Sequence, residues 1–271
     1  MGIDVREIWD FNDPASSEKR FRAILRRKTL SLDEKLEIWA QIARTFSLRN
    51  QCPQCHAILD EFWDDAMAAG PRPKACFELE RGRGFRTAGE PGVAIPYFQI
   101  AAESEEEDLK VDAIHMLAVV ATGAESHRLN LEALKIAQAS SNPWAQRWQG
   151  TLFNNLGWGC FDEGRFDEAV EWFRKALNER EKYGNMHAIR VAKWCLARGL
   201  RAVRDYEGAL VIQRELAQGE ADGYVHEELG EILEAIGQGD DAKAHFRIAA
   251  DKLELEYGVD SEKIQKLRSR A

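Results

Sequence analysis

Small residues recur along this chain at intervals of 33 to 40 positions, and in the best-preserved copies a phenylalanine follows four residues later. The small positions are Cys55, Ala94, Asn130, Ala169, Ala209 and Ala242. Small side chains let two helices approach closely, and a period of this length is typical of stacked repeat architectures. The pattern predicts an array of helix pairs, each burying its apolar side against the next pair.

The clearest copy lies between residues 152 and 180. Leu156 and Cys160 are four positions apart and share one face of an expected first helix. Gly164 is expected to end that helix, and the second helix should begin at Phe166 with two acidic residues at its positive end. The copy is anchored by Phe153, Leu156, Gly157, Cys160, Gly164, Phe166, Ala169, Phe173 and Ala176.

These anchors resemble the tetratricopeptide repeat, with Phe153 in place of the usual tryptophan and Cys160 in place of tyrosine. The resemblance extends over residues 32–257 and is strongest in the fourth and sixth copies. It implies an all-α, right-handed solenoid of about six helix-turn-helix repeats. We expect residues 1–31 to form an N-terminal segment with a capping helix, and residues 258–271 to form a C-terminal capping helix or tail.

Local signals support these boundaries. Asp13-Pro14 should precede the first capping helix, Ser31-x-x-Glu34 reads as a capping box, and Asp260-Ser261 could cap the last helix. Pro71 and Pro73 predict a loop between the first two repeats. Asn130 stands where a small apolar residue is expected, which predicts a local distortion of the third repeat.

In tetratricopeptide proteins the first helix of each repeat lines a concave groove, and the resemblance therefore implies a set of groove residues. That set is rich in arginine, asparagine and aromatic side chains, which suit a peptide backbone, a carboxylate and apolar anchors respectively. The ligand-binding residues implied in this way are Arg44, Arg83, Arg86, His115, Asn154, Asn155, Trp158, Trp194, Arg198, Arg201, Tyr224, Glu227 and Glu231.

Structural interpretations of the same residues stay open. The aromatic side chains could pack between repeats, and the arginines could be solvated or paired within the chain. Glu227, Glu228, Glu231 and Glu234 form an acidic stripe that could be a solvated helix face, could receive a basic segment, or could contact a neighbouring subunit.

Two motifs are candidates for chemistry. Cys52-Pro53-Gln54-Cys55 has the spacing of a redox site or of half a zinc site, but no second such pair occurs. Both cysteines fall on packing positions of the repeat, so we expect a structural role and no metal. Asp112 and His115 lie one turn apart, as an acid–base pair would, but no nucleophile in a recognisable setting accompanies them.

The composition excludes several partner classes. Acidic residues number 46 and basic residues 37, giving a net charge of −9, so no general attraction to nucleic acid or anionic membranes is expected. The first ten residues lack the apolar region of a secretory signal, and five scattered cysteines do not suggest disulfides. We expect a cytoplasmic protein with reduced thiols and no cofactor.

The sequence thus predicts a non-catalytic scaffold that binds a protein or peptide in its groove. A ligand-responsive, peptide-sensing module is the main alternative, and an enzyme or redox protein using His115 or the Cys52/Cys55 pair is a more distant one. A homo-oligomer is compatible with the acidic stripe.

Overall fold

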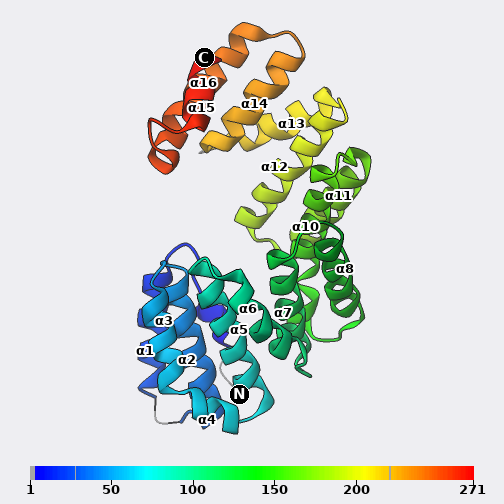
Figure 1. Cartoon of the computed structure of the whole chain (residues 1–271). Helices are drawn as coiled ribbons and strands as arrows, with labels where there is room; N and C mark the ends of the chain where they lie inside the picture. Colours follow the sequence, from blue (N-terminus) through cyan, green and yellow to red (C-terminus); the bar gives the residue numbers. More distant parts are fainter. Residues whose placement is uncertain (1–3, 28, 220) are drawn as a thin grey trace. The chain divides into compact units, whose positions relative to one another are not determined.

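The computed structural model describes residues 4–27, 29–219 and 221–271, and all regular structure in these ranges is helical (Figure 1). The chain divides into two compact units, Met1–Leu152 and Phe153–Ala271. No helix among the described residues is both long and apolar enough to cross a membrane.

Unit 1 contains three helix pairs preceded by a 3-10 turn, η1 (Val5–Ile8), and helix α1 (Pro14–Leu25). Short helices α4 (Trp63–Ala68) and α9 (Pro143–Gln146) follow the first and third pairs. The pairs are α2 (Leu32–Ser47) with α3 (Cys52–Glu61), α5 (Pro71–Thr87) with α6 (Pro91–Ala102), and α7 (Glu107–Val120) with α8 (Gly123–Ala139).

Unit 2 repeats the arrangement with three further pairs and ends in α16 (Glu262–Ser269). The described ranges therefore hold the six pairs expected from the sequence. The pairs are α10 (Gln149–Asp162), whose first turn crosses the unit boundary, with α11 (Phe166–Tyr183), α12 (Met186–Ala202) with α13 (Tyr206–Leu216), and α14 (Gly223–Ala235) with α15 (Gly239–Tyr257).

Close helix contact within a pair depends on the glycine and phenylalanine of the repeat. A Cβ atom placed on Gly157 would lie 2.5 Å from the ring of Phe173, and Gly82 and Gly230 make the same contact with their own phenylalanines. The small residues Ala94, Ala169, Ala209 and Ala242 are 0–1% exposed. The register expected from the sequence is confirmed.

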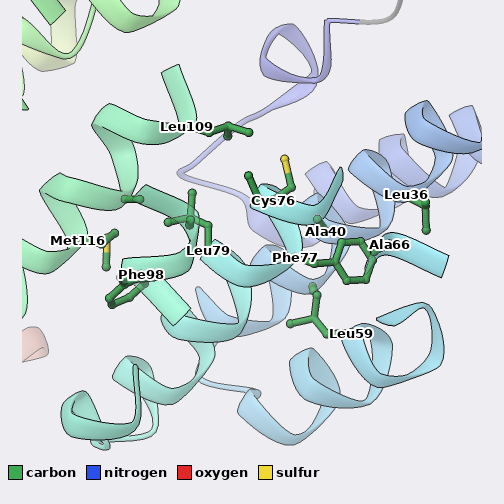
Figure 2. Close-up of a cluster of buried hydrophobic side chains, with 14 of the residues drawn as sticks. Leu36, Ala40, Leu59, Ala66, Cys76, Phe77, Leu79, Phe98, Leu109 and Met116 are labelled. Carbon is green, nitrogen blue, oxygen red and sulfur yellow. The ribbon is translucent and has the colours of Figure 1, made fainter. Parts of the chain in front are cut away.

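The largest buried cluster of unit 1 centres on α5. Figure 2 shows Cys76, Phe77 and Leu79 of this helix between side chains of α2 and α3 on one side and of α6 and α7 on the other. Phe77 is fully buried among Leu36, Leu59 and their neighbours. A single helix thus contributes to the apolar contacts of two successive pairs, which is how a repeat array builds a continuous core.

The helix ends follow the sequence signals in three places and depart from them in one. Asp13 caps α1, Ser31 and Glu34 form a capping box at α2, and Ser261 caps α16. The loop expected at Pro71 and Pro73 is wrong, because both prolines lie in the first turn of α5. Proline is tolerated there since the first amides of a helix have no intrahelical acceptor.

The distortion expected at Asn130 is also absent from α8, which runs unbroken from Gly123 to Ala139. Asn130 is buried, and its amide nitrogen donates to the backbone oxygen of Ser126 at 2.9 Å. The helix itself therefore supplies a partner for the amide. The expected boundaries at residues 31 and 257 coincide with helix ends but stay predictions.

Candidate functional site

Two of the expected ligand residues of unit 1, Arg44 and Arg83, come together in a buried charge cluster. Arg83 pairs with both Glu80 and Asp112, and a nitrogen of Arg44 lies 3.5 Å from Glu80. Helices α2, α5 and α7 each supply part of this cluster, which lies on the face formed by the first helices of the three pairs. Arg83 is 7% exposed and its charge is neutralised inside the chain. Arg86 is exposed.

His115 lies beside this cluster, with its ring centroid 5.0 Å from that of Trp148. Burial lowers the pKa of His115 to about 4, although Asp112 acts in the opposite direction. The imidazole is therefore neutral at neutral pH and has no proton to donate as a general acid.

The cysteines occupy packing positions. All five are free and buried. Burial raises the pKa of the Cys55 thiol to about 12 and that of Cys195 to about 11, so both stay protonated at neutral pH. The described residues contain no group of three or more His, Cys, Asp or Glu side chains arranged to hold a metal. Cys52 and Cys55 lie in the first turn of α3, as the packing interpretation expected.

In unit 2 the three expected aromatic residues form a row, one from each helix pair. The ring centroids of Trp158 and Trp194 are 6.1 Å apart, and those of Trp194 and Tyr224 are 6.3 Å apart. Each side chain is only half-buried. The indole nitrogen of Trp194 donates to the backbone oxygen of Tyr224 at 3.2 Å, which fixes the orientation of its ring. These residues pack against neighbouring repeats and also present an aromatic surface.

Arg198 lies in this row. Its guanidinium carbon is 5.3 to 5.8 Å from the ring centroids of Trp194, Trp158 and Phe161. The described part of the chain supplies no ion-pair partner for Arg198, and its Nε atom is buried without a hydrogen-bond acceptor. A cation held by aromatic rings and without an ion-pair partner among the described residues is suited to receive a carboxylate from outside.

The acidic stripe of α14 is neutralised within unit 2. Glu228 pairs with Arg201, Glu231 and Glu234 with Arg270, and Glu227 with Lys263 at 2.8 Å. Burial alone would raise the pKa of Glu231, but hydrogen bonding to Arg270 and the nearby positive charges outweigh it and lower the pKa. A basic segment does cover the stripe, and it belongs to this chain.

A pocket of about 250 Å³ opens beside the aromatic row, between α12 and α14. Trp194 and Tyr224 form part of its wall, and most of the remaining wall is apolar. Arg190 donates to the backbone oxygen of Leu216 at 3.0 Å at its edge. Among the described residues, the lining is formed by His187, Arg190, Val191, Trp194, Leu216, Asp222, Tyr224 and Val225.

The sequence interpretation missed six residues of this wall, namely His187, Arg190, Val191, Leu216, Asp222 and Val225. Val191 occupies a groove-facing position under the same repeat register that selected Trp194 and Arg198, so the register could have found it. Of the two expected asparagines, Asn154 has its side-chain oxygen buried without a donor, and Asn155 is half-buried. The pocket and the row share Trp194 and Tyr224. We call Trp158, Trp194, Arg198, Tyr224 and this pocket the aromatic face.

Comparison with known proteins identifies the repeat. Residues 150–183, which are α10 and α11, match the family model of the tetratricopeptide repeat. The chain therefore contains a tetratricopeptide repeat at these residues. No curated protein sequence matches it significantly.

Solved structures with this tetratricopeptide fold include three that are similar along most of the chain. PilF of Pseudomonas aeruginosa has a TM-score of 0.62 at 17% identity, over 89% of this chain and 99% of its own. The apo form of RapI has a TM-score of 0.65 at 14% identity, over 98% of this chain and 84% of its own. NprR in complex with its cognate peptide NprX has a TM-score of 0.57 at 10% identity, over 98% of this chain and 80% of its own. At these identities the likeness is one of fold.

Proposed function

We propose that this tetratricopeptide protein is a non-catalytic module that binds an extended peptide segment of a partner on the aromatic face of unit 2. The observation that carries the proposal is Arg198, which is held by three aromatic rings without an ion-pair partner among the described residues. A peptide carboxylate would complete its hydrogen bonding. The fold shared with NprR, a peptide-bound protein, agrees with this class of ligand.

The pocket beside Trp194 defines the second feature of the ligand. Its apolar wall and volume of about 250 Å³ suit one aliphatic or aromatic side chain of a peptide. Because Trp194 contributes to the pocket and also contacts Arg198, the apolar and acidic groups of the ligand should lie close together in its sequence. The preferred ligand is therefore an apolar residue with an adjacent acidic residue or terminal carboxylate.

Selection from a random peptide library against the immobilised protein tests this proposal. Selected peptides should combine an apolar and an acidic residue, and Arg198→Ala should weaken their binding about 10- to 100-fold, since hydrogen bonds to charged groups contribute about 1.5–3 kcal/mol. Arg174→Ala is the matched control, because Arg174 is an exposed arginine on α11. Titration calorimetry gives the dissociation constants.

Free and amidated C termini on the same peptides distinguish a terminal carboxylate from an acidic side chain. If selected peptides bind the Arg198→Ala protein as tightly as the wild type, the assignment of the aromatic face is wrong. The charge reversal of Arg198 together with Arg201 is a poorer test, because Arg201 neutralises the buried Glu228 and its reversal would disturb the fold.

A ligand-responsive regulatory module would bind the same peptides and would also change its dimensions on binding. Small-angle scattering of the full chain with and without a selected peptide separates the two functions.

A further inference from the structure

Residues 4–13, which we call the leading segment, lie on the face of unit 1 that is formed by α2, α5 and α7, the first helices of its three pairs. Arg6 on η1 reaches Asp108 of α7 at 2.9 Å and places its guanidinium carbon 4.0 Å from the ring centroid of Trp144. Three residues later, the indole nitrogen of Trp9 donates to the side chain of Gln41 on α2 at 2.8 Å. These polar contacts come from different helix pairs and from α9, and the buried Val5 adds an apolar contact with the cluster formed by α1 and α2.

The aromatic end of the leading segment covers Arg44. The rings of Trp9 and Phe11 stack with centroids 4.7 Å apart, and the guanidinium carbon of Arg44 lies 5.8 and 5.4 Å from them. Arg44 and Gln41 are both on the face that the repeat pattern implied for ligands. The leading segment therefore occupies part of that face in the way a bound peptide would, through one cationic and one aromatic side chain.

The receiving face keeps its internal partners if the leading segment departs. Asp108 also accepts hydrogen bonds from Arg72 at 3.0 and 3.2 Å and from Asn142 at 3.3 Å. Arg44 likewise keeps its contact with Glu80. Removing Arg6 thus leaves no buried carboxylate without a counter-charge, which is the usual large cost of breaking a buried pair.

Unsatisfied polar atoms lie beneath the same face. Oε2 of Glu80 and Nε of Arg44 are buried without hydrogen-bond partners, and Glu80 is 1% exposed. Buried polar groups are normally paired, and exceptions call for an explanation such as a binding role. Two buried polar atoms close to Trp9 and Phe11 thus lack hydrogen-bond partners while the leading segment is in place.

We propose that this face of unit 1 is a second binding surface, specific for a partner segment carrying arginine and tryptophan in the spacing Arg-x-x-Trp. The leading segment is its tethered occupant and excludes partner segments of the same chemistry until they displace it. This site is separate from the aromatic face of unit 2, and it does not depend on the function proposed there.

Tethering makes the competition quantitative. Because the segment continues directly into α1, its effective concentration is at least the roughly millimolar value of a short flexible linker, and a free peptide of the same sequence must reach that concentration to displace it. Detaching the leading segment removes this competition. The same free peptide should then bind more tightly, although no residue of the receiving face has changed.

The probe is a fluorescently labelled synthetic peptide copying residues 4–13, titrated by anisotropy into the full chain. The double variant Arg6→Ala/Trp9→Ala, which removes the two side chains that hold the occupant on the receiving face, should bind the peptide at least 10-fold more tightly than the wild type. Peptides carrying Arg6→Ala or Trp9→Ala are the matched controls and should each bind at least 10-fold more weakly than the parent peptide. Arg198→Ala should change none of these values.

The proposal is overturned if the double variant is folded by circular dichroism and binds the peptide no more tightly than the wild type. Equal binding of parent and control peptides overturns it as well. Should the double variant not fold, hydrogen exchange of the wild type decides: millimolar peptide should speed exchange at residues 5–12 and leave α11–α15 unchanged. Exchange at residues 5–12 that does not respond contradicts the proposal.

Discussion

At the scale of single residues, the identity of one side chain decides how close two helices can lie. Gly157 faces the ring of Phe173, whereas Gly159 on the same helix has no atom within 4 Å of the position its Cβ would take. The two glycines therefore have different reasons to be present. Only the first is required by packing within the repeat, and the second lowers helix stability without a compensating contact.

Gly157→Ala should lower the free energy of unfolding by about 1–3 kcal/mol, because the added methyl group meets Phe173 in a filled core. Gly159→Ala is its matched control and should raise that free energy by up to ~1 kcal/mol, as alanine favours the helix. Urea denaturation followed by circular dichroism measures both. Equal effects of the two substitutions would show that the contact with Phe173 does not limit the packing.

At the scale of elements, ion pairs join α14 to the helices on both of its sides. Its glutamates pair with Arg201 on α12 and with Lys263 and Arg270, which lie in and directly after α16. Glu228 is the most buried of them, at 2% exposure. The sequence showed the stripe but not its partners, because Lys263 is 36 residues away from Glu227 and Arg201 is 27 residues away from Glu228.

Arg201→Ala should lower the free energy of unfolding by about 1–3 kcal/mol, because it leaves the buried carboxylate of Glu228 without this hydrogen-bonded partner. Arg198→Ala should have a much smaller effect on stability, since Arg198 neutralises no carboxylate among the described residues. Thermal or urea unfolding of the two variants side by side makes the comparison. A stability loss as large for Arg198→Ala would mean that its role is structural.

At the scale of the whole molecule, the protonation of buried histidines should affect the stability of both units. The pKa values of His56 and His115 in unit 1 and of His226 and His245 in unit 2 are all lowered, in each case chiefly by burial. The positive charge of Arg83 also helps to lower the pKa of His115. In the folded chain these imidazoles thus take up protons at a lower pH than they do after unfolding.

Stability should therefore be full above about pH 6.5, the ordinary histidine pKa, and should fall as the pH decreases toward the folded values. With its pKa of about 4, His115 alone accounts for about 2 kcal/mol of the loss between pH 7 and pH 5. Urea unfolding across this range measures the slope. His115→Gln should make the slope shallower, and an unchanged slope would contradict the burial of this imidazole.

The sequence determined the repeat. Small and aromatic residues at Gly157, Ala169 and Phe173 set helix contacts that are local to one pair, so their spacing along the chain already contains the geometry. The helix caps at Ser31 and Ser261 were readable for the same reason, since a cap involves residues only three positions apart.

Only the tertiary structure decided which arginines are available. The repeat resemblance placed Arg83, Arg198 and Arg201 alike on the expected ligand-binding face. In the structure Arg83 and Arg201 pair with carboxylates from neighbouring helices, whereas Arg198 contacts aromatic rings. The division into two units, the pocket beside Trp194 and the contact of Arg6 with Asp108 were likewise not visible in the repeat pattern. These features depend on pairs of residues that lie far apart in the chain. A periodic sequence specifies that adjacent helices pack together, but it does not specify which polar side chains meet between those helices.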